Sequence, residues 1–160
     1  MAEKRFIDRH ASDNTYLHRD FHCAMDQGIA YLGGLYGDEA VDTYLYRFAK
    51  DYYAPLIEKA RQQGLSAIRA HIADVYSLEG VPENVRFAEA EGGLQVSVSA
   101  CPAVAYMRST GYEPSKWYVK TTSVVNTAIA DALNIQFELL AYDEENGAAE
   151  YRFTPKGRML

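Results

Sequence analysis

The chain has 160 residues, of which 48% are hydrophobic and 24% charged, a composition typical of one ordinary soluble domain. Sixteen Lys and Arg residues against 22 Asp and Glu residues give a formal charge of −6, and the acidic groups are spread along the chain. Because nucleic-acid binding needs dense basic groups, these numbers argue against a nucleic-acid partner.

Three further observations concern location and chemistry. No apolar stretch approaches the roughly 20 residues of a membrane span, and the first residues lack the apolar core of a secretion signal, so we expect a cytoplasmic protein with no membrane partner. Cys23 and Cys101 are the only cysteines, which suits a reducing compartment and predicts free thiols. Tyrosine occurs 13 times and fits a pocket wall or a protein interface as well as a core.

The first half of the chain predicts helices. Apolar residues recur at spacings of three and four, and the pattern indicates three helices over residues 13–37, 38–63 and 66–79. We expect Asp38 and Ser66 to cap the second and third helices, and Pro55 predicts a kink or a break within the second. Gly80 and Pro82 end this helical half.

The period then changes to two, which is typical of strands. Apolar Leu94, Val96 and Val98 alternate with polar residues in a hairpin over 85–100. A short helix follows from Pro102, an irregular link covers 112–120, and a helix covers 121–133. Strands 135–142 and 148–154 form a second hairpin around an Asn-Gly turn, which pairs Glu138 with Arg152.

These elements predict an α+β fold in which N-terminal helices pack with an antiparallel sheet built from two hairpins. We expect a single domain over residues 1–160. Its parts are a flexible N-terminal segment over 1–12, a helical half over 13–80, and a hairpin-helix-hairpin half over 83–160.

Cys101 is the most informative residue for chemistry. It stands at the cap of the helix that begins at Pro102, where unpaired backbone N–H groups and the helix dipole favour thiolate over thiol. That placement predicts a nucleophile at neutral pH. The competing interpretation is a small buried hydrophobic side chain, the commonest role of an isolated cysteine.

His18 and His22 lie one helical turn apart. The spacing permits two-point metal ligation or an acid/base pair beside a pocket, and it also fits a partly exposed pair with no role. The zinc-protease motif is absent because Arg19, not Glu, follows His18. We expect no cofactor.

Ring and charge positions in the second half suggest where a ligand could be held. Trp117 and Tyr118 fall in an irregular segment, where core packing explains a ring less easily than on a helix, so they are candidates for lining a ligand site. Arg152 could anchor a carboxylate, and its alternative role is a cross-strand ion pair with Glu138.

The order of elements from Leu94 onward resembles the L-2-amino-thiazoline-4-carboxylic acid hydrolase family and its relatives with the 4-vinyl reductase domain. The sharpest shared motif is Val98-Ser-Ala-Cys101-Pro102, a strand that runs into a Cys-Pro step before a helix. Thr121 and Thr122 stand where family members carry a further cysteine, so Cys101 alone matches residue for residue. The resemblance implies a 4-vinyl reductase-like α+β domain with a small-molecule cavity between helices and sheet, often as a homodimer.

We therefore expect a hydrolase-like enzyme that acts on a C–N or C–S bond of a small carboxylate-bearing compound. Cys101, His22 and His18 are the expected catalytic residues, and Trp117, Tyr118, Arg152 and Thr121 the expected substrate-binding residues. The alternative is a non-catalytic domain that binds or senses a small molecule. A third possibility is a structural subunit whose interface is the tyrosine-rich second helix.

Overall fold

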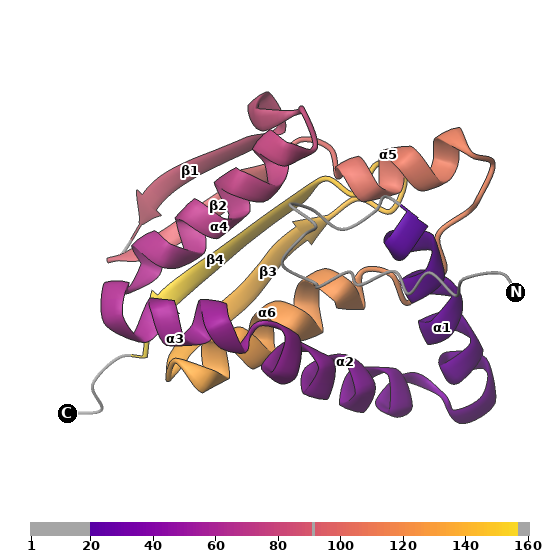
Figure 1. Ribbon diagram of the computed structural model, residues 1–160, viewed down its shortest axis with the longest axis horizontal. Coiled ribbons are helices and arrows are strands. Elements are labelled where there is room, and N and C mark those ends of the chain that lie inside the picture. Colours follow the sequence, from indigo (N-terminus) through magenta and orange to yellow (C-terminus); the bar gives the residue numbers. More distant parts are fainter. Residues whose placement is uncertain (1–19, 91, 157–160) are drawn as a thin grey trace, which may run out of the picture.

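The computed structural model describes residues 20–90 and 92–156 and has an α+β fold (Figure 1). The helices are α1 (Asp20–Tyr36), α2 (Asp38–Tyr52), α3 (Ala54–Gln63), α4 (Leu65–Leu78), α5 (Pro102–Ser109) and α6 (Lys120–Ala132), with a 3-10 turn, η2, at Pro82–Asn84. The strands are β1 (Val85–Ala90), β2 (Gly93–Val98), β3 (Ile135–Tyr142) and β4 (Ala149–Pro155).

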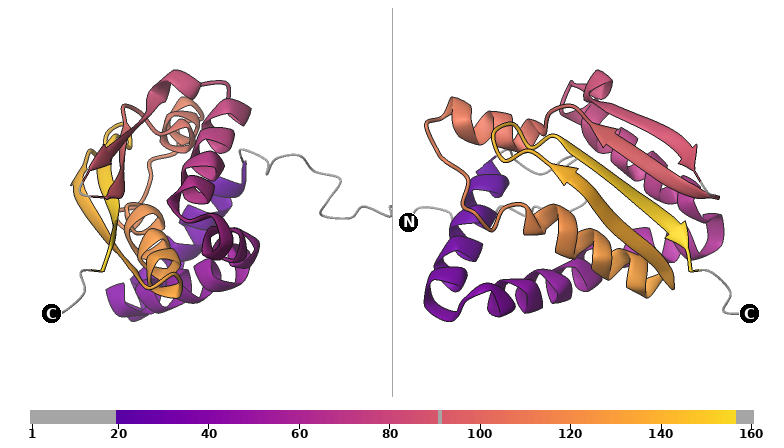
Figure 2. Two further views of the ribbon diagram at one scale, coloured as in Figure 1. Left: turned by 90° about the vertical axis from the view of Figure 1, so that its left-hand side faces the viewer. Right: turned by 180° about the vertical axis from the view of Figure 1, so that it is seen from behind.

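The four strands form one antiparallel sheet in the order β1-β2-β4-β3, so the two predicted hairpins join through their second strands. The helices gather on one face of this sheet (Figure 2). On the sheet itself, α6 packs against β3 and α4 against β1 and β2, while α2 packs against α6. The predicted combination of helices with an antiparallel sheet of two hairpins is confirmed.

The alternation of strand residues separates the two faces of the sheet. Leu94, Val96 and Val98 of β2 are buried together with Ala149, Tyr151 and Phe153 of β4, and they form the floor of the main core. The intervening residues are polar and lie on the open face. There Ser97 Oγ donates a hydrogen bond to Glu150 Oε2 over 2.8 Å. The helices therefore cover the apolar face, as the period of two predicts.

Pro55 breaks the predicted second helix in two. Helix α2 ends at Tyr52, and α3 starts at Ala54 with the proline in its first turn, where a missing N–H costs nothing. The predicted caps are wrong. Gly37 and Gly64, both with positive φ, occupy the cap positions of α2 and α4, and Asp38 and Ser66 fall inside the helices. The predicted start of the first helix near residue 13 lies outside the described residues.

The second hairpin contains one extra residue. Glu138 faces Arg152 as predicted, but the register shifts between Leu139 and Ala141, so Tyr142 faces Ala149 rather than Ala148. Leu140 is the unpaired residue of this β-bulge and is 45% exposed. The pairing predicted for the middle of the hairpin is therefore correct, and the pairing predicted for its turn end is one residue off.

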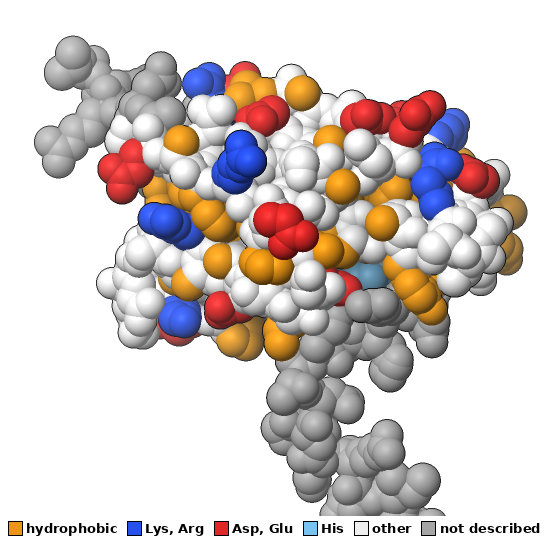
Figure 3. Space-filling model, turned by 90° about the horizontal axis from the view of Figure 1, so that it is seen from above, with side chains coloured by type: hydrophobic (Ala, Val, Ile, Leu, Met, Phe, Trp, Pro, Cys, Tyr) orange, Lys and Arg blue, Asp and Glu red, His pale blue; other side chains and the backbone are white. Residues whose placement is uncertain are grey.

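Acidic and basic side chains are interspersed on the face shown in Figure 3, and apolar side chains lie singly between them. Among the described helices, none has the length and apolar character needed to cross a bilayer.

Candidate functional site

A cavity of about 180 Å³ lies between the apolar face of the sheet and helices α3, α4 and α6. Its apolar walls include Leu56, Ile68, Ile72, Val98, Val125 and Ile129. Its polar lining comes from Cys101, from His71 of α4, from Thr121, Thr122 and Asn126 of α6, and from three tyrosines. The sequence separates these residues widely, and the packing of the helices on the sheet brings them together.

Cys101 borders this cavity from the cap position of α5, with extended backbone angles before the helix begins. Its N–H donates to the carbonyl oxygen of Asn146 over 2.9 Å, which ties the start of α5 to the β3–β4 turn. Gly147 of that turn packs directly on the cysteine, since a Cβ added there would lie 2.5 Å from the Cβ of Cys101. The thiol position is therefore fixed by two segments of the chain.

The charge state of Cys101 differs from the prediction. Burial raises the pKa of the thiol, and the backbone N–H groups of Val104 and Ala103 only partly oppose that rise. The geometry explains the balance, because the cysteine side chain makes no regular capping hydrogen bond to the helix. The expectation of a thiolate at neutral pH is wrong, because the loss of solvation outweighs the attraction of the helix N-terminus.

His71 is a cavity residue that the sequence analysis passed over. It lies on the same face of α4 as Ile68, Ile72 and Val75, and its ring contacts Tyr53 edge to face at a centroid distance of 5.7 Å. Burial lowers the pKa of His71, so the imidazole is neutral at pH 7. The sequence does contain a signal for this placement. His71 follows the helical spacing of Ile68, Ile72 and Val75, which puts the histidine on the apolar face of its helix.

Tyr151 supplies the most unusual polar group of the cavity. Only 6% of this residue is exposed, and its ring packs against Phe137 and Phe153 of the sheet. Within the described part of the chain its hydroxyl has no hydrogen-bond partner. Every described side-chain polar atom that is fully inaccessible to solvent does have a hydrogen-bond partner. Both observations agree if the hydroxyl faces the open volume of the cavity that Tyr151 lines. Burial, followed by the neighbouring Cys101, raises the pKa of Tyr151, so it stays protonated.

Helix α6 provides amide and hydroxyl groups. Thr121 borders the cavity as predicted, and its hydroxyl donates to the carbonyl oxygen of Tyr118 over 2.7 Å. Asn126 donates from its side-chain nitrogen to the carbonyl oxygen of Thr122 over 2.8 Å. The amide oxygen of Asn126 remains as an acceptor for another molecule.

The described lining of the cavity contains no Lys, Arg, Asp or Glu side chain. With Cys101 and Tyr151 protonated and His71 neutral, the cavity is uncharged at pH 7. Burial of an ion without a charged partner is costly, so this lining favours an uncharged occupant.

His22 and Tyr118, two of the predicted site residues, come together outside the cavity. The Tyr118 hydroxyl lies 3.4 Å from His22 Nδ1, and Tyr118 packs in a second apolar cluster with Val104 and Met107. Burial lowers the pKa of His22, and nearby Glu79 partly opposes that effect. His18 lies outside the described residues, within which no group of three His, Cys, Asp or Glu side chains is arranged to hold a metal ion.

Trp117 and Arg152 do not line the cavity. The Trp117 ring covers Gly33 of α1, where an added Cβ would lie 2.6 Å away, and its indole N–H donates to Asp38 Oδ1 over 2.7 Å. Arg152 lies on the open face of the sheet, where it bonds Glu138 over 2.7 and 2.9 Å. Strand alternation and the loop path direct both side chains away from this cavity, and the ion pair of Arg152 with Glu138 is the alternative role given by the sequence analysis.

Comparison with family models, with curated proteins and with solved structures finds no match. The functional assignment therefore rests on the cavity itself.

Proposed function

We propose that this protein binds a small, uncharged organic molecule in the cavity that Cys101, His71 and Tyr151 border. The observation that carries the proposal is the Tyr151 hydroxyl, which opens on the cavity from a buried ring and has no protein partner in the described part of the chain. A hydroxyl in this position can form a hydrogen bond with a bound molecule.

The size and lining of the cavity limit its occupant. About 180 Å³ is more than ten times the space that one water needs, and it is below the roughly 300 Å³ where drug-sized sites begin. Tyr151 would donate a hydrogen bond, the Asn126 amide oxygen would accept one, and the aliphatic walls would contact an apolar body. Because Arg152 lies on the other face of the sheet, we propose an uncharged ligand in place of a carboxylate-bearing one.

The test uses benzamide and benzoate, two compounds of matched size that differ in charge. We expect benzamide to bind with weak, millimolar-range affinity and to shift the NMR signals of Tyr151, Cys101 and Asn126, and benzoate to leave them unchanged. Tyr151→Phe should weaken benzamide binding, and Tyr142→Phe, outside the cavity lining, serves as the control. Equal binding of both compounds, or shifts confined to the surface, would contradict the proposal.

A hydrolase-like enzyme is the second candidate, because Cys101 and His71 border the same cavity. In that mechanism His71, rather than His22, accepts the thiol proton, and the sulfur bonds to the carbon of a C–N or C–S bond. The departing nitrogen or sulfur takes the proton from His71, and water then releases the carbon from Cys101. The raised pKa of Cys101 argues for the binding function.

Alkylation by iodoacetamide in a Cys23→Ala background separates the two candidates. A binding domain should show slow alkylation of Cys101 that accelerates only above pH 9. A rate that already reaches its plateau near pH 7 would favour the enzyme.

A further inference from the structure

Exposed large hydrophobic side chains concentrate on the first two helices. Seven are found in the described part of the chain, and five of them belong to α1 or α2: Tyr31, Leu35, Tyr36, Tyr44 and Tyr52. Tyr36 is 71% exposed and Tyr31 72% exposed. Contiguous apolar surface of this kind marks interaction sites in proteins more often than it marks ordinary surface.

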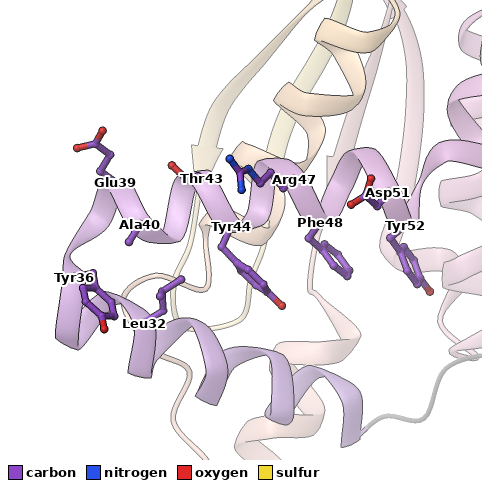
Figure 4. Close-up of a pocket in the computed structure, with 10 residues that line it drawn as sticks. All are labelled: Leu32, Tyr36, Glu39, Ala40, Thr43, Tyr44, Arg47, Phe48, Asp51 and Tyr52. Carbon is purple, nitrogen blue, oxygen red and sulfur yellow. The ribbon is translucent and has the colours of Figure 1, made fainter.

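Tyr36, Tyr44 and Tyr52 of this set border an open groove of about 970 Å³ (Figure 4). We call it the α1–α2 groove and define it by Leu32, Tyr36, Ala40, Tyr44, Phe48 and Tyr52. Three of its rings follow one another at intervals of four residues along α2. Phe48 stacks on Tyr44 at a centroid distance of 6.4 Å and on Tyr52 at 5.2 Å, which makes a continuous aromatic row.

Charged side chains flank this row without forming ion pairs. Glu39, Arg47 and Asp51 project from α2 beside the rings (Figure 4), and none has an ion-pair partner within the described residues. Arg47 is exposed in the middle of the helix, with Glu39 two turns before it. A cation and two carboxylates that have no ion-pair partner among the described residues are suited to pairing with another molecule.

The pattern on α2 is complementary to itself. When two copies of a helix pack antiparallel about a two-fold axis, residues equally far before and after the axis face each other. An axis at Thr43 places Glu39 of each copy opposite Arg47 of the other, about 6 Å along the helix on either side of the axis.

We propose that the α1–α2 groove is the interface of a homodimer, in which the two α2 helices pack antiparallel around Thr43 and Glu39 of each copy pairs with Arg47 of the other. Tyr44 of each copy lies between the two pairs, and the rest of each aromatic row adds apolar contact area beside them. The groove and the internal cavity have no lining residue in common, and they meet where Tyr52 of the groove contacts Tyr53 of the cavity at a ring-centroid distance of 5.0 Å.

Charge reversal tests this geometry. In Glu39→Arg, the introduced arginine of each copy faces Arg47 of the other copy. In Arg47→Glu, the introduced glutamate of each copy faces Glu39 of the other copy. Like charges repel in both cases, so each variant by itself should be monomeric. In a mixture of the two variants, the introduced arginine of one copy faces the introduced glutamate of the other, and the native Glu39 faces the native Arg47. The mixture should therefore form heterodimers, and the double variant E39R/R47E should dimerise again.

The measurement is analytical ultracentrifugation of the whole chain at 5–200 µM. We expect a dimeric wild type, a rise of at least about tenfold in the dissociation constant for each single variant, and recovery in the mixture. Glu83→Arg and Arg86→Glu change the same charges at exposed sites outside the groove and should leave the dimer unchanged.

Three results would overturn the proposal. These are a monomeric wild type over that range, dimerisation that only Arg47→Glu weakens, and a mixture of the single variants that stays monomeric. Circular dichroism keeps these results interpretable, because all substituted residues are exposed and each variant should retain the wild-type helix signal and melting curve.

Discussion

The internal cavity and the α1–α2 groove use the same residue type in opposite ways. The ring of Tyr151 is packed among core aromatics, and its hydroxyl is the part left for another molecule. In the groove Tyr36 exposes the ring itself, at 71% of its surface. The described lining of the cavity carries no charge, whereas acidic and basic side chains flank the groove. The difference shows that a high tyrosine count predicts a binding surface but does not say whether it binds a small molecule or a protein. That depends on whether the hydroxyl or the ring face of each tyrosine remains accessible.

The two regions share the main core, to which Ile29 of α1 and Val41 and Leu45 of α2 belong. Polar contacts in addition attach α1 and α2 to residues 112–120. Lys120 Nζ bonds Asp42 Oδ1 over 2.6 Å, and Trp117 bonds Asp38. The buried carboxylate of Asp26 accepts three hydrogen bonds of 2.7 to 2.8 Å from Tyr112 and Ser115. Substitutions at these contacts should therefore separate the two regions.

We expect the largest effect from Asp26→Ala. The change leaves the Tyr112 hydroxyl and two Ser115 donors without their acceptor, and it should lower the free energy of unfolding by about 3 kcal/mol. Urea denaturation measures the loss, and hydrogen exchange should show it first in α1. Glu83→Ala, an exposed control, should change the stability by less than about 0.5 kcal/mol. Equal losses in the two variants would show that Asp26 does not anchor the groove.

Gly147→Ala should destabilise the cavity wall by about 2 kcal/mol. Gly147 has a φ of 69°, and an added Cβ would lie 2.5 Å from Cys101 Cβ and 2.8 Å from a Val104 methyl group. Gly111→Ala is the matched control, since its φ is 78° but nothing lies within 4 Å of an added Cβ. The difference between the two variants in thermal denaturation isolates the packing effect. If both lose the same stability, the turn does not press on Cys101.

Acid should destabilise the protein by a smaller amount. Burial holds the pKa of His71 and of His22 below the usual 6.5. Between each lowered pKa and 6.5 the unfolded chain binds more protons than the folded chain, so stability falls as the pH decreases through that window. His71→Phe should reduce the slope of unfolding free energy against pH between 7 and 5, and His22→Phe should do the same independently. Slopes equal to the wild-type slope in both variants would exclude these histidines as its source.

The smallest expected effect is that of Tyr151→Phe without ligand. Because the hydroxyl has no protein partner within the described residues, its removal should change the free energy of unfolding by less than about 0.5 kcal/mol. Guanidinium denaturation of the ligand-free protein provides the measurement. A loss above 1 kcal/mol would mean that the hydroxyl stabilises the fold, and the internal cavity would then lack its distinguishing group.

Local patterns in the sequence were enough to predict most of the fold. The alternation of Leu94, Val96 and Val98 fixed the buried face of β2, and the Asn-Gly turn placed Glu138 opposite Arg152. Pro55 correctly indicated the break between α2 and α3. Such features depend on residues that are near one another along the chain, so a single sequence contains them.

The site was predicted less well because it depends on distant contacts. The sequence identified Cys101 and Thr121, which do border the cavity, but it passed over His71 and the partnerless hydroxyl of Tyr151. The assignment of Trp117 failed because the ring packs on Gly33, more than 80 positions away. The helix dipole at Cys101 is a local feature, whereas the burial that reverses its effect arises from the whole fold.

The bulge in β3 affects whether copies of the chain can pair through their sheet edges at high concentration. β3 is an edge strand, and such edges can recruit strands from other copies into growing aggregates. The extra residue at Leu140 breaks the regular spacing of backbone donors and acceptors partway along that edge. An incoming strand would lose its alignment after a few residues, so this irregularity disfavours the addition of a strand at the β3 edge.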